Sequence, residues 1–190
     1  MNIILASKSP RRKEILNDIF KDLKVIKPTY REKIKKNQSP EELCINMAKQ
    51  KALSISKDYP DSYIIGADTI IYINNKILGK PKNKSEAKKY LELLSNKSHE
   101  VFTGVSLINK NKKINTEFFD KTIVYFNKIE SKEISFYISR YRPYDKAGSY
   151  GIQDWSKVFI KKIDGCFYNV VGFPLPKFYK LFADDLNLII

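Results

Sequence analysis

Short apolar runs alternate with segments of helical periodicity along this 190-residue chain. Residues 2–6 form an apolar run that predicts a short buried strand, and residues 11–20 carry apolar side chains at helical spacing. Between these segments, Ser9 suits the N-cap position of a helix and Pro10 suits its first turn. We therefore expect a strand, a polar turn and a helix as the first elements.

The alternation continues through the rest of the chain. A capping box at 39–42 predicts a helix that runs to about residue 58. An apolar strand over 63–65 is expected to end at a Gly-Ala-Asp-Thr turn over 66–69, with an Asn-Asn hairpin turn shortly after it. The remaining predicted elements are strands over 25–26, 70–73, 76–78, 99–108, 114–126 and 157–163, and helices over 85–94, 132–139 (capped by Ser131) and 175–186.

This order of elements predicts an α/β fold with a mixed twisted sheet, a long hairpin and flanking helices. The chain has no internal repeat and no low-complexity linker, so we expect one large domain or two small lobes that share a core. Cys44 and Cys166 lack CxxC spacing and are expected to be reduced. No leader-like segment and no apolar run near the roughly 18 residues of a membrane span is visible, which favours a cytoplasmic protein with no membrane partner.

The formal net charge of +14 permits three interpretations: a nucleic-acid-binding protein, an enzyme for anionic small molecules, or a compositional bias toward Lys, Asn, Ile and Tyr. The lysines are scattered along the chain rather than gathered in one segment. Scattered lysines are typical of solvated helix and turn faces. Charge alone therefore does not select a function.

Several kinds of catalytic site are excluded or disfavoured by residue counts. The single histidine, His99, rules out a zinc site built from two or three histidines, and the two distant cysteines disfavour a thiolate site. His99 lies in an alternating strand, where a structural histidine bonded across strands is favoured over a member of a Ser-His-Asp triad. Neither a GxxxxGK[ST] nor a GxGxxG pattern is present. Carboxylates, oxygen-bound metals and cationic clamps remain.

Anion binding has a local candidate where the first strand turns into the first helix. Ser7, Ser9, Arg11 and Arg12 bring together hydroxyls, two guanidinium groups and the backbone N–H groups of a helix N-terminus. Such groups bind phosphates through charge-assisted hydrogen bonds. A surface arginine pair that serves only solubility is the alternative.

Asp68 is the second candidate, because it follows an apolar strand at the rim of the predicted sheet, where clefts of α/β proteins open. Its carboxylate suits a general base toward water or a ligand for a hard cation such as Mg²⁺. An aspartate that only caps the turn is equally consistent with the pattern. Lys80 lies one hairpin away, near enough to reach the same cleft. The arginine corner and Asp68 are expected to face one another across a single groove.

Five blocks of sequence, taken in order, resemble the motifs of the Maf family. They are Leu5-Ala6-Ser7-Lys8-Ser9-Pro10-Arg11-Arg12, Gly66-Ala67-Asp68-Thr69 with Gly79-Lys80-Pro81, His99-Glu100-Val101-Phe102-Thr103-Gly104-Val105, Asp145-Lys146-Ala147-Gly148-Ser149-Tyr150-Gly151-Ile152-Gln153, and Asn169-Val170-Val171-Gly172-Phe173-Pro174-Leu175. Each block is weak alone, but together they are specific and span nearly the whole chain. The resemblance implies a nucleoside triphosphate pyrophosphatase with an inosine-triphosphatase-like fold over residues 1–190, as two lobes around one cleft. It also implies a divalent cation, Mg²⁺ or alternatively Mn²⁺, and a homodimer.

The resemblance also implies roles for individual residues. Asp68 matches the family's proton acceptor, whereas Arg11, Thr69 and Gln153 match positions linked to substrate choice. The other matching cleft residues are Ser7, Arg12, Glu32, Lys51, Lys80 and Lys146, of which Lys51 and Lys80 join Asp68 as catalytic candidates and Glu32 joins it as a metal ligand; Ser9 stays a substrate-binding candidate from its place at the strand-to-helix corner. The Tyr-Gly-Ile-Gln sequence that ends at Gln153 is similar to the branch that acts on dTTP and UTP, and differs from the branch that acts on 7-methyl-GTP.

Two departures from the family pattern add positive charge near the expected cleft. Arg31 stands where an acidic residue commonly precedes Glu32, and Tyr141-Arg142-Pro143 replaces a common Gly-Glu-Pro. A purine-directed pyrophosphatase therefore stays open as an alternative. So does a nucleic-acid-binding or cell-division regulator without catalysis, which the charge and the many aromatic residues permit. A nucleic-acid partner is disfavoured because most of the aromatic residues fall at core-like positions.

Overall fold

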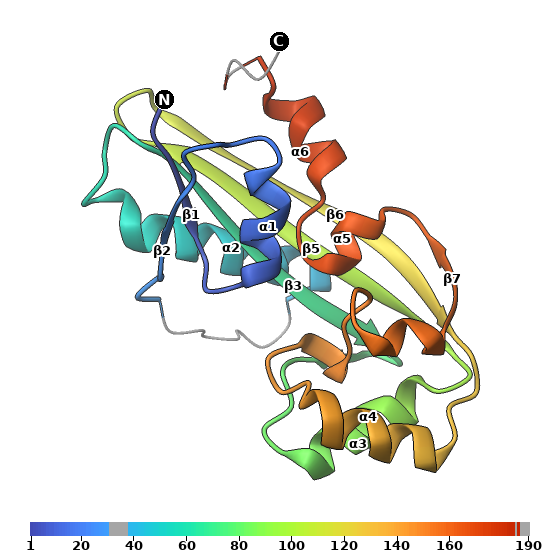
Figure 1. Cartoon of the computed structure of the whole chain (residues 1–190). Coiled ribbons are helices and arrows are strands. Elements are labelled where there is room, and N and C mark those ends of the chain that lie inside the picture. The colour runs from blue at the N-terminus through green and yellow to red at the C-terminus, as the bar shows by residue number, and fades with distance from the viewer. Residues whose placement is uncertain (31–37, 185, 187–190) are drawn as a thin grey trace. The chain divides into compact units, whose positions relative to one another are not determined.

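The computed structural model of the protein describes residues 1–30, 38–184 and 186. Helices and strands alternate along the chain, as the pattern predicts (Figure 1). The strands are β1 (Ile3–Ala6), β2 (Lys24–Ile26), β3 (Tyr63–Ile73), β4 (Lys76–Leu78), β5 (Ser98–Asn109), β6 (Ile114–Phe126) and β7 (Ile160–Asp164). The helices are α1 (Pro10–Asn17), α2 (Pro40–Ser56), α3 (Lys84–Leu94), α4 (Ser131–Tyr141), α5 (Phe167–Val171) and α6 (Leu175–Phe182), with 3₁₀ segments η1 (Ala147–Ser149) and η2 (Trp155–Phe159).

The strands form one seven-stranded mixed sheet in the order β2-β1-β3-β5-β6-β7, with β4 paired to β3. β1 runs parallel to both β2 and β3, whereas the pairs β3–β4 and β6–β7 are antiparallel. Parallel strands joined through helices and antiparallel strands joined by hairpins together make a mixed α/β fold. The predicted fold class, with its long hairpin of β5 and β6, is confirmed.

The residues group into two compact units. The first unit comprises Met1–Thr69, Thr103–Asp120 and Gly172–Ile190, and the second comprises Ile70–Phe102 and Lys121–Val171. Strands β3, β5 and β6 each contribute residues to both units. Three of the four crossings between the units therefore lie within strands, and the fourth follows α5, between Val171 and Gly172.

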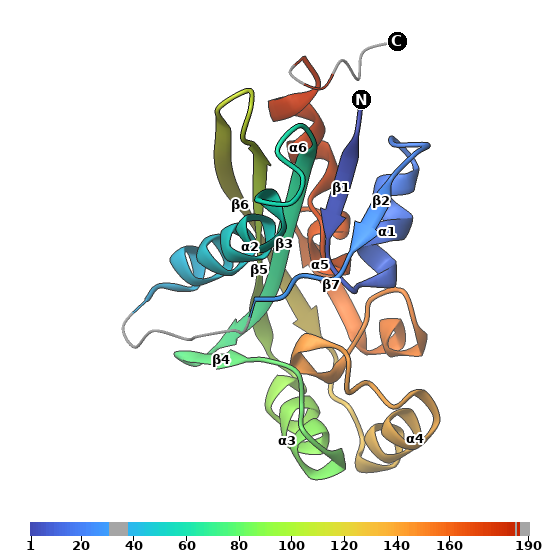
Figure 2. The same ribbon diagram turned by 90° about the vertical axis from the view of Figure 1, so that its left-hand side faces the viewer.

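In the first unit, helices cover both faces of the strands. Ile4 of β1 and Ile64 of β3 pack with Ala52 and Ile55 of α2. Because successive side chains on a strand point to opposite faces, the residue after each of these points away from α2. Figure 2 shows α2 on one side of β1 and β3 and α1 on the other. Neighbouring positions on one strand can therefore serve different helices.

Two glycines, Gly66 of β3 and Gly104 of β5, allow α2 to lie directly on the sheet. A Cβ atom on Gly66 would overlap the carbonyl oxygen of Ala48, and one on Gly104 would overlap the backbone of Cys44. The predicted turn at 66–69 is wrong, because these residues lie inside the continuous strand β3. Gly66 has no positive φ angle, so the reason for glycine here is the close approach of a helix rather than a turn.

The second unit has its own hydrophobic core. Leu91 and Leu94 of α3 and Ile134 and Tyr137 of α4 pack against the β5 residue Val101. All five side chains are almost inaccessible to solvent. This core supports the loop that holds η1, since Tyr150 and Ala147 belong to the same cluster.

The structure corrects several element boundaries. α4 is capped by Glu130 rather than by Ser131, and η2, whose start is capped by Asp154, replaces the first part of the predicted strand over 157–163. α5 lies where the sequence pattern predicts only a loop, and α6 ends at Phe182. Short helices lack the repeated apolar spacing on which a sequence pattern depends.

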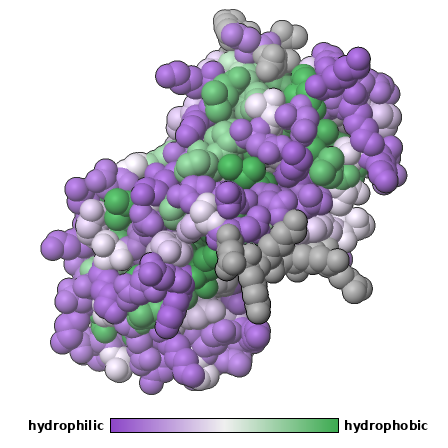
Figure 3. Space-filling view, turned by 180° about the vertical axis from the view of Figure 1, so that it is seen from behind, coloured by the Kyte–Doolittle hydropathy of each residue, from purple (hydrophilic) through white to green (hydrophobic). Residues whose placement is uncertain are grey.

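The described surface agrees with the interpretation of the lysines as solvated. Figure 3 shows hydrophilic residues spread over the visible face, with hydrophobic residues interspersed. None of the helices in the described part of the chain has both the length and the apolar character that a membrane crossing requires.

Candidate functional site

The predicted corner between β1 and α1 is present in the first unit. Ser9 has extended backbone angles, and its side chain accepts a hydrogen bond from the backbone N–H of Arg12, as an N-cap does. The hydroxyl of Ser7 in turn accepts from the N–H of Ser9 at 3.1 Å. Pro10 occupies the first helical turn, where its missing N–H costs no hydrogen bond. The first turn of α1 is thereby built from the predicted residues.

Arg12 is buried and ties this corner to β3. Its Nη2 donates to the hydroxyl of Thr69 at 2.8 Å, and its Nε donates to the carbonyl of Gly172 at 2.8 Å. A longer bond of 3.5 Å runs from Nη1 to the hydroxyl of Ser7. The Thr69 hydroxyl also meets that of Thr103 at 2.9 Å. Arg12 therefore fixes the start of α1 against the strand that carries Asp68.

Arg11 has a different environment from its neighbour. Adjacent helix residues point about 100° apart, so Arg12 is buried whereas Arg11 stays partly exposed. Arg11 follows the N-cap of α1, the end at which backbone N–H groups attract anions. The two arginines that the motif places side by side thus differ in access to solvent.

Asp68 forms an ion pair with Lys51 of α2. The two side chains are only 9% and 13% exposed, so water screens the pair much less than it screens a surface pair. Burial and, second, the negative charge of Asp68 raise the pKa of the Cys44 thiol to about 12. Cys44 therefore stays protonated and does not supply a thiolate ligand.

Asp68 and Thr69 leave β3 on opposite faces. Asp68 meets Lys51 of α2, and Thr69 meets Arg12 of α1. The pairing of β1 with β3 ends at Ala6 opposite Gly66, so both side chains lie just beyond the carboxyl end of β1. The structure brings the arginine corner next to Asp68, but through adjacent positions on one strand rather than as groups pointing at one another.

The second unit holds the other predicted side chains. Lys80 and Gln153 are exposed. Lys146 is mostly buried, and its Nζ lies 3.0 Å from Asp145 and 3.6 Å from Asp154. The backbone N–H of Gly148 donates to the carbonyl of Gly79 at 3.0 Å. This bond joins the segment that carries Lys80 to the segment that carries Lys146.

The donor set for a metal ion is small. No cluster of three or more His, Cys, Asp or Glu side chains with metal-binding geometry occurs among residues 1–30, 38–184 and 186. The predicted ligand Glu32, like Arg31, lies outside the described residues. Mg²⁺ is commonly held by one or two carboxylates together with substrate phosphates. Asp68 as a single described carboxylate fits that mode of binding.

Three further groups at these sites carry no predicted role. The Gly172 carbonyl and the Thr103 hydroxyl bind the Arg12–Thr69 pair, and both residues lie inside blocks that resemble the family. Asp154 contacts Lys146 and accepts from the Tyr137 hydroxyl at 3.1 Å. No sequence signal marks Asp154, because its partners come from separate elements.

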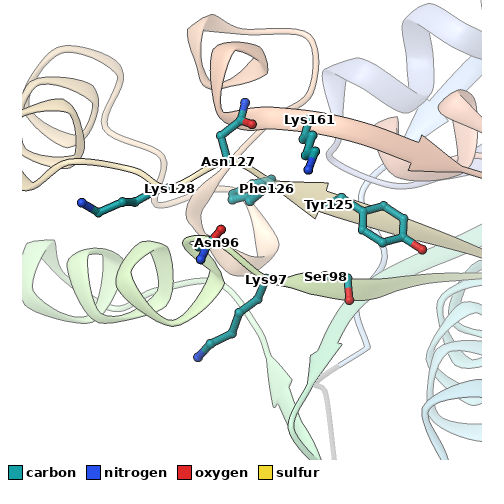
Figure 4. A pocket seen from close by; sticks show the side chains of 8 residues that line it. All are labelled: Asn96, Lys97, Ser98, Tyr125, Phe126, Asn127, Lys128 and Lys161. Atoms are coloured by element: carbon teal, nitrogen blue, oxygen red, sulfur yellow. The ribbon is translucent and has the colours of Figure 1, made fainter.

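A shallow pocket of about 220 Å³ in the second unit is separate in residue content from the candidate site. It is lined by Asn96, Lys97, Ser98, Tyr125, Phe126, Asn127, Lys128 and Lys161. Figure 4 shows the ends of the Lys97 and Lys128 side chains apart from one another, and Lys128 pairs with Glu130 at 3.0 Å. The lysines do not converge on one bound group.

A family model and the relatives found by sequence agree on one family. The family model described as Maf-like protein matches residues 2–184. A protein of Carboxydothermus hydrogenoformans named dTTP/UTP pyrophosphatase is 41% identical over 95% of this chain and 96% of its own length. One of Bacillus anthracis with the same name is 43% identical over 92% and 91%. The solved structure of the Staphylococcus aureus Ham1 protein is similar with a TM-score of 0.45 and 18% identity, over 66% of this chain and 72% of that one.

Proposed function

The chain belongs to the Maf family, and on that basis we propose that it is a nucleoside triphosphate pyrophosphatase that hydrolyses dTTP and UTP to the monophosphate and pyrophosphate. The observation that carries the chemistry is the buried Asp68–Lys51 pair beside Thr69, which Arg12 holds. A buried carboxylate one strand position before the threonine that binds the α1 corner suits hydrolysis of a phosphoanhydride.

The corner between β1 and α1 takes the phosphates. Arg11, which is partly exposed, contributes a positive charge, while the N-terminus of α1 contributes oriented N–H groups. Behind this helix end lies a hydrogen-bonded network in which Arg12 donates to the hydroxyls of Ser7 and Thr69. Ser9 keeps this end of the helix in register through its cap. These positive groups stabilise the charge that develops on the leaving pyrophosphate.

Asp68 orients and deprotonates the water that attacks the α-phosphorus. Lys51 fixes the direction of the carboxylate through their ion pair and adds a positive charge beside the reacting phosphate. A general base must lie within hydrogen-bond reach of its water, so a fixed carboxylate lowers the cost of reaching that geometry.

The residues that would hold a divalent cation, Mg²⁺ or alternatively Mn²⁺, are Asp68 and, from the family resemblance, Glu32, together with phosphate oxygens of the substrate. When bound, the cation screens the phosphate charge and stabilises the leaving group. Its requirement is testable by chelation, and the choice between the two metals by adding each back.

The resemblance to the family links Gln153, a residue of the second unit, to substrate choice. Gln153 has an exposed amide that offers both a donor and an acceptor, which suits the edge of a pyrimidine base. Lys80 and Lys146 contribute positive charge. A homodimer and a cytoplasmic location stay predictions from the sequence.

The test is pyrophosphate release measured across dTTP, UTP, CTP, GTP, ATP and 7-methyl-GTP with Mg²⁺. We expect the highest kcat/KM with dTTP and UTP. A preference for 7-methyl-GTP or another purine nucleotide would overturn the proposed substrates but support the proposed reaction. Absence of pyrophosphate release from every triphosphate would overturn the proposal.

A further inference from the structure

His99 is the one histidine of the chain, and the proposed chemistry does not use it. Its side chain is 2% exposed, and its Nε2 lies 2.8 Å from the hydroxyl of Tyr150. The sequence pattern favours a partner on a neighbouring strand, but the partner comes from the loop that follows η1. The imidazole therefore connects β5 to that loop.

The pair sits in a tight aromatic environment. The His99 ring meets Phe126 edge-on at 5.0 Å and Tyr150 at 5.4 Å, and Phe126 meets Tyr150 at 4.9 Å. Burial lowers the pKa of His99 to about 3 and raises the pKa of Tyr150, so both groups are neutral near neutral pH. A neutral, buried hydrogen bond of this kind holds one geometry and does not respond to small changes in pH.

The loop 146–153 needs such anchors because its backbone is unusual. Gly148 and Ser149 follow one another with φ angles of 62° and 65°. Residues other than glycine rarely adopt this left-handed conformation, and surrounding contacts must maintain it. A Cβ on Gly148 would also press against Ile71. The loop therefore keeps its course through outside contacts.

Three contacts anchor the loop between its two predicted substrate residues. Gly148 donates to the carbonyl of Gly79, and Ser156 bonds both the N–H and the carbonyl of Gly151 at 3.1 and 2.8 Å. The third contact is the His99–Tyr150 bond. Tyr150 stands between Lys146 and Gln153 in the sequence, so its hydroxyl restrains the stretch of backbone that joins them.

We propose that His99 and Tyr150 are positioning residues whose hydrogen bond holds the loop 146–153, and with it Lys146 and Gln153, in the geometry that selects pyrimidine triphosphates. This inference rests on the proposed function for its substrate, but not for the loop itself. Neither residue touches the reacting atoms. Their effect is on substrate affinity and discrimination, rather than on the chemical step.

The direct test is Tyr150→Phe, which removes one hydroxyl and keeps the ring that packs on Phe126. We expect the KM for UTP and dTTP to rise about 3- to 10-fold, as for the loss of one neutral hydrogen bond, with kcat within about twofold. Preference over GTP shrinks by a similar factor. The matched control is Tyr63→Phe, which removes a buried hydroxyl that accepts from Lys112 and leaves the kinetics unchanged.

A second pair of variants separates positioning from simple packing. His99→Phe is expected to reproduce the KM and discrimination of Tyr150→Phe, whereas His99→Gln, which keeps a polar group near Nε2, recovers most of the affinity. Combining His99→Phe with Tyr150→Phe is expected to add little, because both remove the same bond. A lower melting temperature with unchanged KM and discrimination in these variants would overturn the proposal.

Hydrogen–deuterium exchange on the ligand-free protein tests the loop without any activity. We expect the amides of Gly148 to Gly151 to exchange faster in Tyr150→Phe than in wild type or Tyr63→Phe. Unchanged exchange overturns the positioning role. A third outcome separates the two proposals. If the amides exchange faster in Tyr150→Phe but the wild-type protein releases no pyrophosphate from any triphosphate, the proposed function is overturned and the role of the His99–Tyr150 bond in holding the loop stands.

Discussion

Asp68 and Thr69 are adjacent on β3, yet each holds a different helix. The carboxylate of Asp68 pairs with Lys51 of α2, and the hydroxyl of Thr69 accepts from Arg12 of α1. The alternation of side chains along a strand produces this division. It places a candidate general base and a candidate phosphate-binding corner at one point of the sheet while keeping their hydrogen bonds separate.

Asp68→Asn tests the general base. We expect kcat for UTP to fall by about 10²–10⁴, the usual contribution of a positioned base, with the fold retained because the amide is nearly the same size. Stopped assays of pyrophosphate release measure the loss. Asp58→Asn, at an exposed position in the first unit, serves as the control. Near-normal turnover in Asp68→Asn would remove Asp68 from this role.

The two arginines are expected to respond differently to truncation. Arg11→Ala should raise the KM for triphosphates about tenfold or more, since it removes a charge-assisted contact, and should lower the melting temperature less than Arg12→Ala does, because Arg11 is less buried than Arg12. Steady-state kinetics and thermal unfolding of the same preparations check both parts. Unaltered kinetics with dTTP and UTP would contradict the phosphate role of Arg11.

Arg12→Ala should also destabilise the fold. It leaves the Gly172 carbonyl and the Thr69 hydroxyl without a donor that both now use, and we expect the free energy of unfolding to drop by about 1.5–3 kcal/mol. Urea denaturation measures this drop. A stability equal to that of Arg11→Ala would show that the Arg12 bonds do not hold the corner together.

Gly66→Ala tests the close packing of α2 on β3. The added methyl group overlaps the backbone of Ala48, so we expect a loss of about 1–3 kcal/mol or more, as in overpacked cores. Gly79→Ala is the matched control, because a Cβ there meets open space. Chemical denaturation of both variants gives the comparison, and equal stabilities would argue against close packing at Gly66.

The buried histidine gives the protein an acid-sensitive component of stability. Burial lowers the pKa of His99 from 6.5 to about 3, so below pH 6.5 the unfolded chain binds a proton that the folded chain does not. This contribution is complete above pH 6.5 and is lost as the pH falls toward 3. The slope from this group approaches about 1.4 kcal/mol per pH unit.

Unfolding free energies of wild type and His99→Phe, measured from neutral to acidic pH, isolate this component. Carboxylates contribute to both proteins and cancel in the difference. We expect the unfolding free energy of wild type minus that of His99→Phe to decrease as the pH falls, so that acid destabilises wild type more than the variant. A pH-independent difference would show that His99 binds its proton at the same pH in the folded and the unfolded chain.

The parts of the fold that the sequence pattern predicts well depend on local signals. Ser9 and the apolar spacing that follows it are enough to place α1, because a cap acts within one turn. The turn predicted at 66–69 fails for the opposite reason. Glycine is required at position 66 because the backbone of Ala48, which lies 18 positions earlier in the chain on α2, leaves no space for a Cβ atom. A local sequence pattern does not indicate a contact of this kind.

The candidate site shows the same limit. The motif blocks identify Arg12 and Thr69, but not that the two are bonded to one another through a shared network with the Gly172 carbonyl. Asp154 escapes notice because its contacts with Lys146 and Tyr137 exist only after folding. Sequence identifies residue types and spacing, whereas partners depend on tertiary structure.

The distance between α2 and the strands below it depends on two hydrogen atoms, those that Gly66 and Gly104 carry in place of side chains. Lys51 belongs to that helix, so the distance from its ammonium group to Asp68 depends on the two glycines. A larger side chain at either glycine would lift the helix and draw the cation away from the carboxylate. Replacements at these two sites are therefore expected to impair turnover even in variants that still fold.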